Sequence, residues 1–302
     1  MQDKEKIMKL YICIDDTDDL TKETSTGKIS DLIAKEIIKM GGTLIKGVTR
    51  HQLLLHDDIK YTSHNSAMCM VVDVVSDAFP KIKEAGEKIL RENMAESSDP
   101  GICFCVSDRL NDPSKLMVFG RKAQKEVITK EEAYDLAHEL DGVILEEYGG
   151  RGLGIIGALS GVGLRMTGCD GTFRGGKDSE FEGQSFSVKK WKEMTDIEQV
   201  VDFEGNILAD HVDVKANDQL KLAHLDHKKT LIAKEKDGQY IACKKKDIYD
   251  GNRILNTWNT SCPDFESDND IEEQYDNTSK ACYNCLYRRW TTGGFECVKR
   301  GT

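Results

Sequence analysis

The stretch Ile14-Asp15-Asp16-Thr17-Asp18-Asp19 follows the apolar run Lys9-Leu10-Tyr11-Ile12-Cys13, which is typical of a short buried strand. Four carboxylates therefore arrive within five positions, where this strand is expected to end. A hydroxyl-rich segment, Thr24-Ser25-Thr26-Gly27-Lys28, comes next. Apolar residues then recur at helical spacing, at Ile29, Leu32, Ile33, Ile37 and Met40. The predicted order is strand, acidic turn, hydroxyl-rich loop and helix.

This order predicts a site for a nucleotide phosphate and a metal ion. A helix N-terminus presents free N–H groups to an anion. Carboxylates beside it are the hard oxygen ligands that Mg²⁺ prefers. The crowded aspartates repel one another, and a bound cation relieves that repulsion. The alternative is a solvated acidic turn in which Ser25 or Thr26 serves as an ordinary helix cap.

Three further strands and a second helix are predicted in the first third of the chain. Residues 43–55, 66–75 and 102–106 are apolar runs typical of strands. A helix is expected to open at Asp77, with Pro80 in its first turn, where proline is tolerated. Together with the first strand and helix, this gives the order βαββαβ of a ferredoxin-like unit.

A glycine-rich segment follows two helical segments that meet near Thr129 and a short strand at 143–145. Residues 149–157 contain G-x-G-x-x-G, the dinucleotide-binding pattern. We reject that function, because the parallel βαβ repeat is missing and Asp170 comes too early for the ribose. The segment is instead interpreted as a helix whose small residues, Gly157, Ala158 and Gly161, permit close packing. The alternative is that its glycines let a substrate approach the backbone.

The rest of the chain changes in composition. Residues 174–178 are predicted to be an exposed loop or a mobile flap. Residues 200–248 alternate apolar and polar positions around turn signals, as in hairpins. We therefore predict an α+β protein in four parts. These are a ferredoxin-like acidic-motif domain (1–110), a glycine-rich α/β substrate-binding domain (111–198), a small β subdomain (199–260) and a cysteine-rich metal-binding tail (261–302).

The tail carries a C-x-x-C pair, Cys282 and Cys285, with Cys297 downstream and Cys262 upstream. Four such thiolates are able to hold zinc or an iron–sulfur cluster. A redox dithiol is the alternative, but no thioredoxin-like βαβ pattern surrounds the pair. Arg288, Arg289, Trp290, Lys299 and Arg300 make the tail basic and aromatic.

The formal net charge of −11 argues against nucleic acid as an obvious partner of the whole chain, although the basic tail keeps RNA as a candidate. No apolar run approaches the roughly 20 residues of a membrane span. The N-terminus lacks a signal-peptide core, so we expect a cytoplasmic protein without a membrane partner. Most of the other cysteines lie singly in apolar runs and are expected to be small buried hydrophobic residues.

Two patches of the chain carry a family resemblance. The I-D-D-T-D of residues 14–18 resembles the opening of the archaeal tRNA agmatinylcytidine synthetases, the TiaS family. Gly150-Arg151-Gly152 running into 156–159, and Asp170-Gly171-Thr172-Phe173, resemble that family's G-R-G…I-G-A-L and D-x-T-[FY] segments. The motifs occur in the family's order. The resemblance extends over about the first 175 residues.

The resemblance implies an ATP-dependent ligase that phosphorylates the carbonyl oxygen of a cytidine in tRNA and then replaces the phosphate by the amine of agmatine. It implies that Asp15, Asp16 and Asp18 organise Mg²⁺ and phosphate. The residues that we predict to bind the nucleotide are Thr17, Ser25, Thr26, Lys28, Arg50 and Asn65, with Lys28 or Arg50 taking the place of a family arginine that this sequence lacks. The residues that we predict to bind the substrate are His64, Gly150, Arg151, Gly152, Gly157 and Asp170.

This sequence departs from the family pattern at several positions. The local sequence is T-S-T-G-K where the family has C-T-T, and Ser63 and His64 replace an arginine and a glycine of its T-R-G-N-A segment. The acceptor, a tRNA cytidine or a small molecule, and the identity of the amine stay open. The alternative function, from a different class, is a non-catalytic metal-knuckle protein that binds RNA or a protein partner through its tail.

Overall fold

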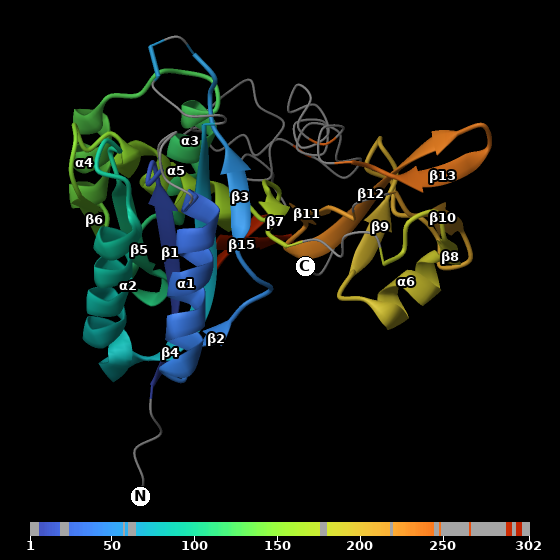
Figure 1. Ribbon diagram of the computed structural model, residues 1–302, viewed down its shortest axis with the longest axis horizontal. Coiled ribbons are helices and arrows are strands. Elements are labelled where there is room, and N and C mark those ends of the chain that lie inside the picture. Colours follow the sequence, from blue (N-terminus) through green and yellow to red (C-terminus); the bar gives the residue numbers. More distant parts are fainter. Residues whose placement is uncertain are drawn as a thin grey trace, which may run out of the picture. The chain divides into compact units, whose positions relative to one another are not determined.

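The strand predicted before the acidic turn lies at the centre of an antiparallel sheet. In a computed structural model of the chain, β1 (Ile7–Asp15) pairs on one side with β4 (Ser66–Val75) and on the other with β5 (Gly101–Val106). Strand β3 (Thr49–Gln52) continues the sheet beyond β4, and β6 (Val143–Glu147) continues it beyond β5. The resulting order is β6-β5-β1-β4-β3, with the short β2 (Thr43–Leu44) also paired to β4 (Figure 1).

The structure describes most of the chain but not all of it. The described residues are 6–18, 24–56, 58–59, 65–175, 180–217, 220–244, 248, 266, 288–291 and 294–297.

Helices α1 (Thr26–Lys39) and α2 (Phe79–Asn93) cover one face of this sheet. The 3₁₀ turn η1 (Ser76–Ala78) leads into α2. Alternate residues of β1, namely Leu10, Ile12 and Ile14, point into this core and are fully buried there. They pack with Ile29, Ile33 and Ile37 of α1 and Ile82 and Leu90 of α2. The predicted helical spacing of these isoleucines therefore identifies the face of α1 that contacts the sheet.

Helix α5 (Gly154–Met166) covers the opposite face, where it contacts β1, β4 and β5. Helix α3 (Pro113–Ala123) packs against α5, and α4 (Lys130–Glu139) follows with Thr129 as its N-cap in a capping box. The short η2 (Ser107–Arg109) precedes α3. A Cβ at Gly161 would overlap the Cys13 sulfur, so the predicted close packing of this helix by small residues is confirmed.

The sequence predicts one strand over 43–55, and this is wrong. The structure has two short strands, β2 and β3, because Lys46 and Gly47 adopt left-handed φ values of 59° and 102° between them. The interpretation of the strand cysteines is confirmed: Cys13, Cys69, Cys103 and Cys105 are free and buried.

The second part of the chain contains the expected hairpins. Strand β12 (Lys228–Lys236) is central: it pairs with β11 (Leu222–Leu225) and β13 (Gln239–Ala242) in antiparallel fashion and with β9 (Gln199–Val201) in parallel fashion. Strand β7 (Thr172–Phe173) pairs with β11, and β10 (Asp213–Lys215) joins β13 to β8 (Ser185–Ser187).

Helix α6 (Val188–Met194) and the strand before it were not predicted. Trp191 of α6 is fully buried, and its ring lies edge-on to Phe181 and Phe186. This aromatic cluster, with Val188, Val200 and Leu231, forms the core of the second part. The indole N–H of Trp191 donates to the Val214 carbonyl at 3.0 Å, so this buried donor has a hydrogen-bond partner.

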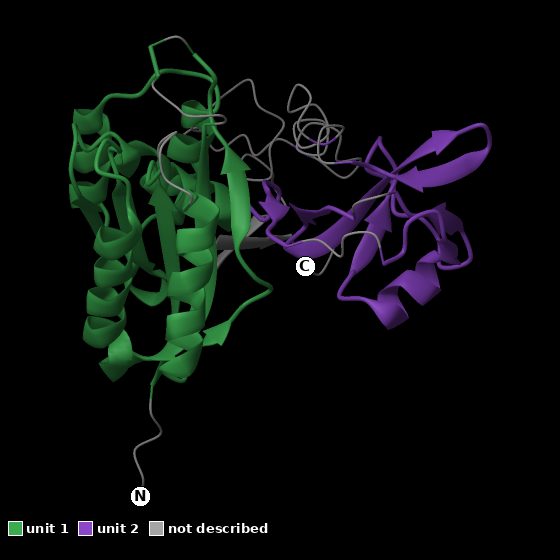
Figure 2. Cartoon of the chain, in the orientation of Figure 1, with its two compact units in different colours: residues 1–166, 291–294 green, residues 167–290, 295–302 purple. Residues whose placement is uncertain are grey.

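The chain forms two units, each with its own core (Figure 2). Unit 1 contains residues 1–166 and 291–294, and unit 2 contains residues 167–290 and 295–302. Strands β14 (Arg288–Thr291) and β15 (Gly294–Cys297) pair with each other. The architecture is mixed α and β, in agreement with the predicted α+β class. The four-part division and the cysteine knuckle stay predictions. Among the described residues, no helix has both the length and the apolar character needed to cross a membrane.

Candidate functional site

The acidic turn lies between the end of β1 and the start of α1, as the sequence predicts. Strand β1 ends at Asp15, and Asp16 follows in a left-handed conformation with φ 51°. Thr17 is fully buried, and its hydroxyl donates to the Thr26 hydroxyl at 3.0 Å. Its carbonyl accepts the Ala95 N–H at 2.9 Å, which joins the turn to the segment after α2. The turn is therefore a fixed part of the fold.

The N-terminus of α1 faces the carboxylates of this turn. Asp18 Oδ2 accepts the Thr26 N–H at 3.2 Å. Ser25 is the N-cap, and its hydroxyl accepts the N–H of the exposed Lys28 at 3.3 Å. The acidic turn and the N-terminus of α1 therefore lie next to each other, as predicted. The arrangement also includes the ordinary cap that the sequence left as an alternative.

Asp15 differs from the other aspartates because its side chain lies on the α5 face of the sheet. It is only 8% exposed, and a Cβ at Gly157 would overlap its carboxyl group. Burial, and to a smaller degree the nearby Asp16 and Asp18 carboxylates, raise the pKa of Asp15 to about 8. Asp15 therefore carries a proton over much of the neutral range in this structure. Gly157, predicted as a substrate-binding residue, provides the space for this carboxyl.

The G-R-G segment forms a tight loop before α5. Gly149, Gly150 and Gly152 all have positive φ, and a Cβ at Gly150 or Gly152 would overlap a neighbouring carboxylate. Arg151 is held by Asp99, whose two carboxylate oxygens accept the Arg151 backbone N–H and its Nε–H. The Asp99 carbonyl also accepts the Gly154 N–H at 2.8 Å, so this one residue joins both ends of the loop.

Two further side chains position the loop. Glu147 pairs with Lys130, and Lys130 donates to the Arg151 carbonyl at 3.0 Å. Asp99 and Lys130 were not predicted, because neither lies in a motif. Asp99 precedes a Pro-Gly pair and Lys130 lies where the two predicted helical segments meet, so their sequence contexts indicate only a turn and a helix start. The two predicted motifs meet here, since α5 begins beside Asp99 and then passes over Asp15.

Arg50 and Asn65 lie near the same end of the sheet. Arg50 of β3 is 8% exposed and donates through Nε to the Ser66 hydroxyl at 2.9 Å. Ser66 begins β4, and the register that pairs Ile14 with Met68 brings this end of β4 beside the end of β1. Asn65 donates to the Leu54 carbonyl at 2.7 Å and closes the neck of the intervening loop.

Asp170 belongs to unit 2, in the turn before β7. Gly168 and Gly171 on either side have positive φ, as expected for a turn. Although it lies on a turn, Asp170 is only 1% exposed. Its carbonyl oxygen lies 3.2 Å from His224 Nδ1, and the neighbouring glycine carbonyls accept N–H groups of β11 and of its turn. These contacts hold the Asp170 backbone against β11 and the turn that follows it, where the residue is buried.

Several predicted residues lie outside the described part of the chain. These are His64 and the tail cysteines Cys262, Cys282 and Cys285, while Cys297 is described only as backbone of β15. Within the described ranges, no group of three or more His, Cys, Asp or Glu side chains is arranged to hold a metal ion. The magnesium, zinc and iron–sulfur assignments therefore stay predictions.

Of the comparisons with known proteins, only the one with solved structures finds similarities to this chain. No protein-family model and no curated protein matches the sequence. A structure described as a tRNA fluorescent labeling enzyme is 26% identical, with a TM-score of 0.45, over 52% of this chain and 36% of its own. Apo TiaS, the tRNAIle2 agmatidine synthetase, is 24% identical with a TM-score of 0.44, over 52% of this chain and 35% of its own. The matches span about a third of these neighbours' own length.

Proposed function

We propose that the protein is an ATP-dependent ligase of the agmatinylcytidine-synthetase type. In this proposal a phosphoryl group passes from ATP to a carbonyl oxygen of the acceptor, with release of ADP. An amine then attacks the carbon of that carbonyl group, and phosphate leaves. The observation that carries the proposal is the meeting of the acidic turn, the α1 N-terminus and the G-R-G loop around Asp15 in unit 1.

The charges of the site support a role in phosphate chemistry. Phosphoryl transfer needs little covalent help from the protein and depends on positioning and charge stabilisation. Lys28 in the first turn of α1 and Arg50 of β3 are the cations that we assign to the phosphates. The phosphates would compete with Asp18 for the N–H groups at the helix end, where the helix dipole favours an anion.

We assign two carboxylates of the turn to Mg²⁺. Mg²⁺ usually binds through one or two carboxylates together with substrate phosphates and water. Asp16 and Asp18 are partly exposed and are the two that we assign to it. Asp15, buried beneath α5, instead positions the turn against that helix. When bound, the ion would neutralise charge on the transferred group.

We also assign the first part of unit 1 to the ferredoxin-like class. The order β5-β1-β4-β3, with each pair antiparallel and α1 and α2 on one face, supports this assignment. A tRNA cytidine is the acceptor and agmatine the amine to be tested first. The resemblance in the two sequence motifs is the reason for this choice.

An ATP-turnover assay with Mg²⁺, agmatine and tRNA tests the proposal. Asp16→Asn should reduce turnover at least about a hundredfold, as the loss of one electrostatic group does in other sites. Asparagine tolerates the left-handed backbone of position 16, so the fold should persist. Asp108→Asn, the same change at an exposed position after β5, is the matched control.

The outcome also separates the two candidate classes. A non-catalytic metal-knuckle protein shows no ATP turnover in the wild-type chain. If folded Asp16→Asn instead keeps wild-type ATP turnover, the protein is an enzyme but the acidic turn is not part of its active site. Turnover that needs ATP but is indifferent to tRNA would favour a small-molecule acceptor.

A further inference from the structure

Unit 2 contains a pocket of about 460 Å³ whose lining includes none of the residues assigned to ATP or Mg²⁺. This size lies within the range of small-molecule sites. Its apolar lining includes Phe173 at the end of β7, Met194 at the end of α6 and Leu222 at the start of β11. Its charged lining residues are Arg174, Lys229 and Asp196. The pocket thus combines an apolar wall with an excess of positive charge.

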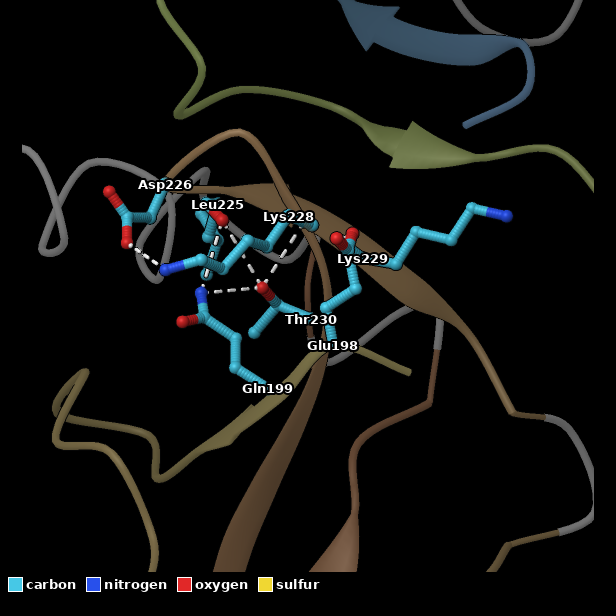
Figure 3. A network of polar contacts seen from close by, with 7 residues as sticks. All are labelled: Glu198, Gln199, Leu225, Asp226, Lys228, Lys229 and Thr230. Carbon is cyan, nitrogen blue, oxygen red and sulfur yellow. Dashed lines mark hydrogen bonds and ion pairs between the residues drawn. The ribbon is translucent and has the colours of Figure 1, made fainter. Parts of the chain in front are cut away.

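The backbone of Lys229 is held firmly at this pocket. Glu198 accepts its N–H at 2.8 Å, and the Lys229 carbonyl accepts the Glu198 N–H at 2.9 Å. Next to it, the buried Gln199 donates to the Leu225 carbonyl at 3.1 Å and to the Thr230 hydroxyl at 2.8 Å (Figure 3). These bonds join β9 to both strands of the β11–β12 hairpin, so the lysine starts from a fixed position.

The side chain of Lys229 extends away from this network (Figure 3). Its ammonium group lies 5.4 Å from the centre of the Phe173 ring and pairs with Asp196, which is 60% exposed. An ammonium group has three N–H donors, and the pair with Asp196 accounts for one of them. Arg174 follows Phe173 directly in sequence and contributes a second cation to the same pocket.

We propose that this pocket binds a small molecule that combines an apolar, flat body with an anionic group. The anion, a phosphate or a carboxylate, lies against Lys229 and Arg174. The apolar body lies against Met194, Leu222 and the Phe173 side of the pocket. Charge-assisted hydrogen bonds at the partly enclosed wall supply the preference for an anion, because they are stronger than bonds between neutral groups.

The test uses three probes that share a benzene ring: phenyl phosphate, benzoate and the neutral benzyl alcohol. Binding to the full chain is followed by methyl NMR of ¹³C-labelled methionine, with the Met194 signal assigned from Met194→Leu. Phenyl phosphate or benzoate should shift the Met194 signal in a saturable way, and benzyl alcohol should bind at least about tenfold more weakly. The ratio of the two anions tells a phosphate site from a carboxylate site.

Lys229→Met keeps most of the apolar stem and removes the charge. It should raise the Kd of the anionic probe by about ten- to a hundredfold, the effect of losing one charge-assisted hydrogen bond. Lys190→Met, in α6 and 52% exposed, is the matched control and should leave the Kd unchanged. If Lys229→Met fails to fold, Lys229→Arg takes its place and should retain binding.

Three results would overturn the proposal. They are the absence of any saturable shift at Met194 in the wild-type chain, equal affinity for benzyl alcohol and the anions, and unchanged affinity in folded Lys229→Met. This test measures probe binding and not ATP turnover. The pocket proposal and the proposed ligase function can therefore each be overturned without affecting the other.

Discussion

At the level of single residues, the site depends on the contact between Gly157 and Asp15. Replacing Gly157 by alanine places a methyl group where the Asp15 carboxyl lies. Relief requires the buried Asp15 side chain to rotate away from α5, or the helix to shift. Overpacking of this kind costs about 1–3 kcal/mol. We expect Gly157→Ala to lower the midpoint of urea unfolding and to reduce ATP turnover.

Gly86→Ala in α2 is the matched control for this prediction. Its new methyl group would lie 3.4 Å from the nearest atom, Phe104 Cζ, which is an ordinary contact. Alanine is favoured over glycine inside a helix by about 1 kcal/mol. The control should therefore match or exceed the wild-type stability. Equal stability of the two variants would show that the α5–β1 contact yields easily.

The protonation of Asp15 gives a prediction about pH. Its pKa is about 8 in the folded chain, well above the value of about 3.9 in the unfolded chain. Between these values the folded state binds the extra proton, so this group lowers the free energy of unfolding as pH rises from about 4 towards 8. Asp15→Asn removes this dependence. The stability of the variant relative to wild type should rise steadily from pH 5 to pH 8.

Chemical denaturation at several pH values measures this difference. Asp108→Asn, at an exposed position in the same unit, should show a constant difference from wild type over the same range. A constant difference for Asp15→Asn as well would mean that Asp15 ionises normally and that water reaches it beneath α5.

At the level of elements, the N-cap of α1 allows a test of whether Ser25 only stabilises the helix or also helps to bind ATP. Ser25 caps α1 and Thr129 caps α4, each through a side-chain bond to a backbone N–H. Removal of either hydroxyl should cost about 1 kcal/mol of stability. If the α1 N-terminus receives phosphate, Ser25→Ala should also weaken ATP binding, measured by calorimetry, while Thr129→Ala should not. Similar ATP affinity in both variants would leave Ser25 as a cap alone.

The elements also show what the sequence was able to predict. Strands β1 and β4 and helix α1 were found because their apolar residues keep a regular period, and the predicted boundary near Thr129 lies at the N-cap of α4. The break at Lys46 and Gly47 was missed because one residue of the pair is an ordinary lysine. Helix α6 was missed because it is short and lies in a polar stretch. Asp99 was missed because its partners lie about fifty residues away, beyond any local pattern.

At the level of the whole molecule, the tail cysteines predict a bound metal. The purified chain should contain about one zinc ion, or iron with sulfide when it is prepared without oxygen. Elemental analysis of Cys282→Ser/Cys285→Ser should show that the metal is lost. Cys243→Ala, a change at a buried cysteine of unit 2, should retain it. Full metal content in the double variant would exclude this knuckle.

The passage of α5 over Asp15 also determines when the site comes into being during synthesis of the chain. Residues 15 and 157 are separated by almost the entire length of unit 1, so their contact closes one of its longest loops. A nascent chain that has not yet exposed α5 to the solvent leaves Asp15 hydrated and fully ionised. The acidic turn therefore acquires its buried proton only after the ribosome has completed the G-R-G loop and the helix behind it.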